Sequence, residues 1–212
     1  MVVGSTGLVG RHTLQIALAH PGIERVVAPV RRPVGEHPKL LCPVIDFDAL
    51  PVDASWWGVD AVICALGTTI RAAGSQEAFR RVDHAYPLAV ARLARQHGTP
   101  TYVLNSAMGA DANSRIFYSR VKGDVERDLA TLGFASLTFV RPGLIGGERE
   151  EFRAGERIAT AALRALHPLL PRRWRINPAE RIAQAMIGAA VRAEPGVHVV
   201  ASDALTWRIT GA

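Results

Sequence analysis

The stretch Gly4-Ser5-Thr6-Gly7-Leu8-Val9-Gly10 is the strongest indication of the fold, because it places three glycines three residues apart between an apolar start and a helical pattern. At a strand-to-helix turn, the first glycine permits a tight turn, the second lets backbone approach a pyrophosphate, and the third brings helix and sheet close together. The helix N-terminus then presents unpaired N–H groups and a partial positive charge to an anion. The stretch predicts a phosphate-binding turn, although a glycine turn without a ligand can have the same spacing.

The flanking residues complete a βαβ unit around this turn. Met1-Val2-Val3 is typical of the end of a strand, residues 11–20 of a helix that stops at Pro21-Gly22, and residues 26–30 of a second strand. A first strand of three residues would be short for the centre of a sheet. We therefore expect the natural chain to begin upstream of Met1.

The alternation of strands and helices continues along the chain. Apolar runs predict strands at residues 44–45, 61–66, 101–104 and 135–140, and helical spacing predicts long helices at residues 75–97 and 114–132. This order predicts an α/β protein with a doubly wound parallel sheet, the Rossmann fold. Beyond residue 147 we expect helices at 157–166 and 180–191 and a short strand at 197–200. We expect residues 1–212 to form a single domain, with 147–212 as a small C-terminal helical cap beside the substrate.

Composition narrows the classes of protein to consider. The 212 residues are 49% hydrophobic, which suffices for one sizeable core. An apolar run long enough to cross a membrane and a secretory signal are both missing from the sequence, so we expect a cytoplasmic protein. Cys42 and Cys64 are expected to be reduced packing residues, and the spacing of the histidines predicts no metal site.

The net charge of +6 raises the question of nucleic-acid binding. All but two of the 25 basic residues are arginine, and they are scattered among acidic residues. The tight cluster Arg172-Arg173-Trp174-Arg175 is more typical of a solvated loop or a cofactor contact than of a nucleic-acid patch. We expect nucleic acid not to be a partner.

Three residues could carry chemistry. Tyr118 and Lys122 are four apart on a predicted helix, so they share one face about one turn from each other. A nearby ammonium favours the phenolate form of a tyrosine, and Lys122 is one of only two lysines in the chain. Ser106 follows the strand at 101–104, where it could hydrogen-bond a substrate oxygen. An isolated pair with the spacing of Tyr118 and Lys122 is more often an ordinary pair on a helix surface.

Together these motifs resemble those of a short-chain dehydrogenase/reductase of the extended or atypical group, with the greatest likeness to the Tat-interacting-protein branch. Besides the glycine turn, the matching stretches are Leu66-Gly67-Thr68-Thr69, Arg81-Val82-Asp83, Ser106-x-x-Gly109-Ala110-Asp111, Tyr118-x-x-x-Lys122-Gly123 and Arg141-Pro142-Gly143.

The resemblance implies a role for each matched residue. Ser106 would polarise a carbonyl, Tyr118 would donate its proton as hydride arrives, and Lys122 would bind the nicotinamide ribose. The cofactor would be flanked by Leu66, Gly67, Thr68, Pro142, Gly143 and Leu144. Asp83 departs from the asparagine that many extended members carry at this position.

The choice of cofactor follows from the end of the second predicted strand. A carboxylate there would bind the adenosine ribose of NAD, but this chain has Arg31 and Arg32. A guanidinium suits a 2′-phosphate, because it is always charged and can bond two oxygens at once. We expect NADP(H) rather than NAD(H), with Asp46 and Phe47 beside the adenine.

These observations predict an NADPH-dependent oxidoreductase that reduces a carbonyl of a small molecule. An alternative is an NADP(H)-binding regulator that senses redox state or contacts a protein partner, with little or no turnover. A nucleotide-sugar epimerase or dehydratase is disfavoured, because such enzymes usually carry a larger C-terminal domain. Both a monomer and a homodimer fit the sequence.

Overall fold

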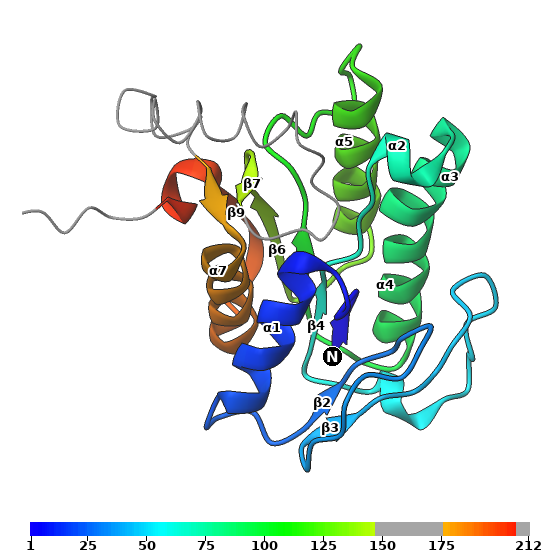
Figure 1. Ribbon diagram of the computed structural model, residues 1–212, viewed down its shortest axis with the longest axis vertical. Coiled ribbons are helices and arrows are strands. Elements are labelled where there is room, and N and C mark those ends of the chain that lie inside the picture. The colour runs from blue at the N-terminus through cyan, green and yellow to red at the C-terminus, as the bar shows by residue number, and fades with distance from the viewer. Residues whose placement is uncertain (147–175, 207–212) are drawn as a thin grey trace, which may run out of the picture.

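Five parallel strands form the central sheet in the computed structural model, which describes residues 1–146 and 176–206 (Figure 1). Their spatial order is β1 (Val2–Val3), β4 (Ala61–Cys64), β5 (Thr101–Asn105), β6 (Ser136–Arg141) and β9 (Gly196–Ala201). All neighbouring pairs are parallel. Their carboxyl ends therefore meet at one edge of the sheet, where open α/β sheets bind ligands.

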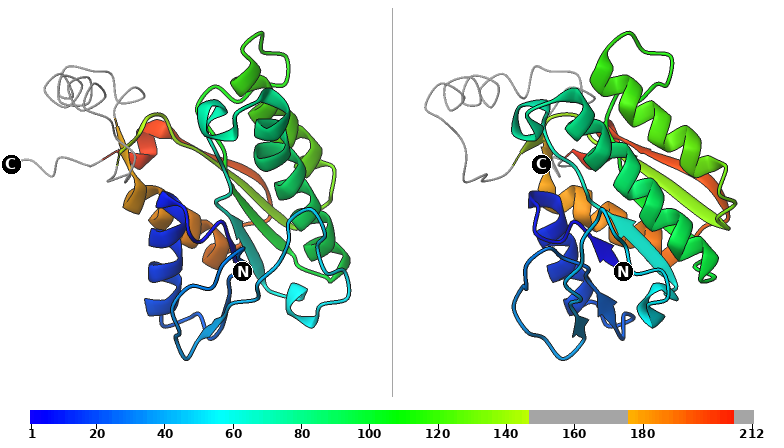
Figure 2. Two further views of the ribbon diagram at one scale, coloured as in Figure 1. Left: turned by 45° about the vertical axis from the view of Figure 1, so that its right-hand side comes forward. Right: turned by 90° about the vertical axis from the view of Figure 1, so that its right-hand side faces the viewer.

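Helices cover both faces of this sheet, which confirms the predicted doubly wound α/β fold. One face packs against α1 (Leu8–Ala19) and α7 (Ala179–Arg192), and the other against α4 (Tyr86–Gln96) and α5 (Phe117–Ala130) (Figure 2). Successive β5 side chains alternate between the two layers, so that Tyr102 joins the α4/α5 core and Val103 the α1/α7 core.

A separate two-stranded parallel sheet joins β2 (Val26–Val27) to β3 (Leu40–Leu41). The prediction of a strand at residues 44–45 is wrong, because only an isolated bridge between Val30 and Val44 is found there. Pro43 explains the interruption, because it has no N–H to donate to the ladder with the segment that continues β2.

The helix predicted at 75–97 is a succession of three helical segments. These are α3 (Gln76–Arg80), a π-helix (Arg81–Ala85) and α4. The short helix α2 (Ile70–Ala73) and a 3₁₀ turn (Ser55–Trp57) were not predicted. The side chains of Thr69 and Ser75 cap α2 and α3 by accepting N–H bonds from Ala72 and Ala78.

The described C-terminal residues belong largely to the sheet and its layers. Two short strands, β7 (Ile145–Gly146) and β8 (Asn177–Pro178), pair in parallel before α7. The helix and strand predicted at 180–191 and 197–200 are present as α7 and β9, with β9 at the edge of the central sheet, and a 3₁₀ turn (Ser202–Leu205) follows. The helix predicted at 157–166 lies outside the described residues, so a cap at 147–175 remains a prediction.

Candidate functional site

The loop between β1 and α1 requires its glycines for close backbone approach. Gly4 has φ +81°, and a Cβ there would lie 2.7 Å from the backbone of Ala65 and Leu66. A Cβ on Gly10 would lie 1.9 Å from the carbonyl oxygen of Gly4. Gly7 precedes the first turn of α1 and supplies no capping side chain. The N–H groups of that turn, around Leu8 and Val9, are suited to a bound phosphate.

A cavity of about 530 Å³ opens beside this loop at the carboxyl edge of the sheet. It collects ten of the residues predicted to bind the cofactor, namely Gly4, Ser5, Thr6, Gly7, Arg31, Asp46, Phe47, Leu66, Gly67 and Thr68. Leu8, Val9 and Gly10 follow as the first residues of α1, and Arg32 follows Arg31 as an exposed residue. The residues present fit a dinucleotide, because glycine backbone, a helix N-terminus and a guanidinium all face one cavity.

Two polar residues that line this cavity were not predicted from the sequence. Tyr86 and Asp48 line the same cavity, and the Tyr86 hydroxyl donates a 2.8 Å hydrogen bond to Asp48. The rings of Phe47 and Tyr86 lie 5.5 Å apart. Burial, and then the hydrogen bond to Asp48, raise the pKa of Tyr86. Helical spacing alone could not show that the first residue of α4 faces this cavity.

Pro142, Gly143 and Leu144 form a second part of the same edge, after β6. The Pro142 carbonyl accepts a 2.7 Å hydrogen bond from the Met108 N–H, and the Gly143 N–H donates at 2.7 Å to the Asn177 side chain. Leu144 is 54% exposed. These bonds tie the segment to the loop after β5 and to β8 rather than to the cavity that the glycine loop lines.

Tyr118 and Lys122 lie on the first two turns of α5, as predicted. Tyr118 is 37% exposed, and its ring centroid lies 5.7 Å from that of Phe79. Lys122 is buried, with Nζ 2.7 Å from Oδ1 of Asp83. Burial lowers the pKa of Lys122, but the Asp83 carboxylate and the neighbouring Tyr118 outweigh burial and raise it above its ordinary value. Lys122 is therefore an ammonium at neutral pH.

Ser106 is placed differently from the expected role. It is 4% exposed, and its hydroxyl donates to Oε1 of Glu126. Glu126 in turn accepts two bonds from Arg141, one of them 3.0 Å from Nε. A hydroxyl has one hydrogen to donate, so Ser106 in this arrangement joins the end of β5 to α5 instead of presenting a donor to a carbonyl.

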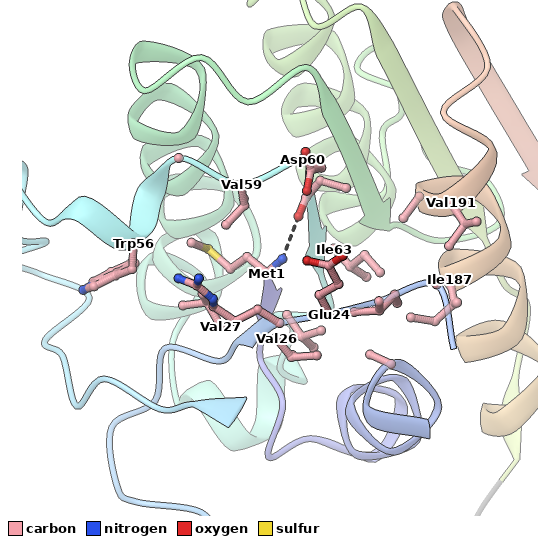
Figure 3. Close-up of a pocket in the computed structure, with 18 of the residues that line it drawn as sticks. Met1, Glu24, Val26, Val27, Trp56, Val59, Asp60, Ile63, Ile187 and Val191 are labelled. Carbon is pink, nitrogen blue, oxygen red and sulfur yellow. Dashed lines mark hydrogen bonds between the residues drawn. The ribbon is translucent and has the colours of Figure 1, made fainter. Parts of the chain in front are cut away.

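A second cavity, of about 650 Å³, lies at the opposite, amino-terminal edge of the strands (Figure 3). Its walls combine apolar side chains, among them Met1, Val26, Val27, Trp56, Ile187 and Val191, with the charged residues Glu24, Arg25 and Asp60. The Met1 amino group donates a 2.7 Å hydrogen bond to the Ala61 carbonyl. None of the residues predicted to bind cofactor or to act in catalysis lines this cavity.

Within residues 1–146 and 176–206, no group of three or more His, Cys, Asp or Glu side chains could hold a metal ion. In the same ranges, no helix is both long and apolar enough to cross a bilayer.

Comparison with curated proteins gives relatives along nearly the whole chain. The mitochondrial protein fmp52 of Emericella nidulans is 35% identical over 99% of this chain and 94% of its own length. Its namesake in Aspergillus niger is also 35% identical, with the same coverage. No family model matches the sequence. The expectation of a cytoplasmic protein is wrong, because these relatives are named mitochondrial proteins.

Solved structures share the fold at low sequence identity. MoeE5 in complex with UDP-glucose and NAD superposes with a TM-score of 0.70 at 17% identity, over 93% of this chain and 73% of that one. The reductase domain of PhqB from Penicillium fellutanum gives a TM-score of 0.65 at 16% identity, over 93% and 65% of the two chains. This protein therefore belongs to the Fmp52 family and shares the Rossmann fold of these solved structures.

Proposed function

We propose that this protein is an NADPH-dependent oxidoreductase of the short-chain dehydrogenase type that reduces a carbonyl of a small molecule. One observation carries the proposal: a continuous set of contacts joins the cavity to the Tyr118/Lys122 pair. Thr68 lines the cavity and donates its N–H to Asp83 at 2.9 Å, and Asp83 pairs with Lys122, one helical turn from Tyr118. The loop after β4, which lines the cavity, is thus linked to the candidate acid Tyr118 through Asp83 and Lys122.

The chemistry is divided between the cofactor and two side chains. NADPH, when bound, would supply the hydride. Tyr118 donates the phenolic proton to the carbonyl oxygen, and its partial exposure lets solvent return that proton after turnover. Lys122 is held as an ammonium and stabilises the negative charge that Tyr118 acquires.

Arg31 supports NADP(H) over NAD(H). It is the residue of the cavity that can pair with a 2′-phosphate, and Arg32 lies next to it in sequence. Solved neighbours such as MoeE5 contain NAD, which supports a nicotinamide dinucleotide in general. The preference for NADP(H) over NAD(H) rests on Arg31 and Arg32.

The geometry of Ser106 favours a second candidate function. Because the Ser106 hydroxyl is committed to Glu126, a reductase here relies on Tyr118 for the hydrogen bond to the carbonyl. An NADP(H)-binding regulator, the alternative within the Tat-interacting-protein likeness, needs no such donor. Ser106 would then stabilise the junction of β5 and α5 and take no part in turnover.

The two candidates separate in an assay of NADPH oxidation against a panel of aldehydes, ketones and quinones. Turnover on a carbonyl supports the reductase. Micromolar NADPH binding with no turnover on any compound supports the regulator.

A further inference from the structure

The π-helix at Arg81–Ala85 holds one carboxylate against α5. Asp83, at the centre of this turn, is 1% exposed. Two ion pairs fix the turn to α5 on either side: Arg80 NH1 lies 2.9 Å from Asp124, and His84 Nε2 lies 2.8 Å from Asp128. Single π turns occur often at functional sites, because the extra residue redirects a side chain.

The two oxygens of Asp83 have different partners. Oδ1 lies 2.7 Å from Lys122 Nζ, whereas Oδ2 accepts the Thr68 N–H at 2.9 Å. A Cβ on Gly67 would lie 3.5 Å from Oδ1, so the loop after β4 packs directly on this carboxylate. Asp83 therefore contacts both the wall of the cavity and the ammonium next to Tyr118.

The effect of Asp83 on Tyr118 depends on which other charged groups face the Lys122 ammonium. The titratable groups that face the ammonium are Asp83 from the π turn, Tyr118 from α5 and Cys64 from β4. Cys64 is a buried thiol whose pKa is raised mainly by burial, so it carries no charge at neutral pH. The full negative charge at the ammonium is then that of Asp83. It offsets the field that would otherwise favour the Tyr118 phenolate.

We propose that Asp83 is a positioning residue that offsets the charge of Lys122 and so favours the protonated, proton-donating form of Tyr118 in carbonyl reduction. The inference rests on the proposed function. In the step concerned, hydride from the dinucleotide adds to the carbonyl carbon while the O–H bond of Tyr118 breaks and its proton goes to the carbonyl oxygen. The products are the alcohol, the oxidised dinucleotide and a tyrosinate, which regains a proton from water.

The test is the ultraviolet absorbance titration of tyrosinate, which requires no substrate. The chain has three tyrosines, and subtracting the titration of a matching Tyr118→Phe variant isolates Tyr118. In Asp83→Asn, we expect the Tyr118 midpoint to move to lower pH by about one unit, because an opposing charge is lost near the ammonium. An unchanged or higher midpoint would overturn the inference. That result would not bear on the proposed reductase activity, which is tested separately by measuring NADPH turnover.

Three further variants control for folding and for general effects of charge. Glu194→Gln removes a carboxylate that pairs with Arg192 beyond the end of α7, and should leave the Tyr118 midpoint unchanged. If Asp83→Asn does not fold, the pair Lys122→Gln and Asp83→Asn/Lys122→Gln serves instead. Lys122→Gln should raise the midpoint, and the double variant should restore it to near the wild-type value. Equal midpoints in these two variants would contradict the inference.

Discussion

Lys122 and Asp83 form a buried ion pair, with 2.7 Å between Nζ and Oδ1, at the point where α5 meets the loop that lines the dinucleotide cavity. The side chains are only 5% and 1% exposed, so both charges depend on each other for solvation. The pair therefore links the helix that carries the candidate acid Tyr118 to the loop that lines the cavity.

Removing Lys122 alone should strongly destabilise the fold. Lys122→Met leaves the Asp83 carboxylate buried and without its ammonium, and we expect a loss of about 3–5 kcal/mol in the free energy of unfolding. Urea denaturation measures this loss. The matched control is Arg192→Gln, which breaks an exposed pair with Glu194 and should cost less than about 1 kcal/mol. Equal losses in the two variants would contradict the buried pairing.

The glycine loop should not tolerate a methyl group at Gly10. Gly10→Ala would place Cβ 1.9 Å from the Gly4 carbonyl oxygen, so the loop has to shift and the phosphate site is distorted. We expect a loss of roughly 1–3 kcal/mol in stability and weaker NADPH binding by calorimetry. Gly35→Ala is the control, since its Cβ would meet nothing within 4 Å. Unchanged NADPH affinity in Gly10→Ala would show that the dinucleotide lies elsewhere.

Arg31→Ala tests the choice of cofactor. Loss of a guanidinium facing a 2′-phosphate should weaken NADPH binding about tenfold or more and leave NADH binding nearly unchanged. Calorimetry with both dinucleotides measures the ratio, with Arg32→Ala as a second variant and the exposed α4 residue Arg92→Ala as the control. A wild-type affinity for NADH equal to or better than that for NADPH would refute the preference.

The pair between His84 and Asp128 should contribute stability that is lost in acid. Burial raises the pKa of Asp128, but hydrogen bonds from His84 and Arg127 outweigh burial and lower it below the ordinary value of 3.8. A lowered pKa in the folded state stabilises the protein above that ordinary value, and the contribution disappears as the pH falls through the lowered value. The stability difference between wild type and Asp128→Asn should narrow as the pH falls below ~pH 4. A difference that stayed constant into that acid range would contradict the assignment.

The sequence was sufficient for the features that depend on local patterns. The glycine spacing and the Tyr118/Lys122 spacing each predict a geometry within one loop or one helix, and the structure has the loop at β1–α1 and the pair on α5. The strand predicted at 44–45 was wrong because Pro43, directly before it, removes a ladder donor, which a count of apolar residues does not register.

Side-chain contacts between different helices and strands could not be predicted from the sequence. The commitment of Ser106 to Glu126 depends on a register between β5 and α5, and the pairing of Asp83 with Lys122 depends on a π turn within a helical pattern. Apolar periodicity predicts which face of a helix is buried, but not where one extra residue in a turn redirects a carboxylate.

We expect Tyr118 to donate the proton in an NADPH-dependent reduction. NADPH oxidation by the Tyr118→Phe variant measures this role. On a carbonyl that the wild type reduces, kcat/KM should fall by about 100-fold or more, while the Kd for NADPH stays near the wild-type value. Tyr102→Phe is the matched control: it removes a buried hydroxyl that donates to the Pro87 carbonyl, and should retain activity. A Tyr118→Phe variant that reduced the same carbonyl within about twofold of the wild-type rate would contradict the claim, since an essential proton donor accounts for at least about 100-fold.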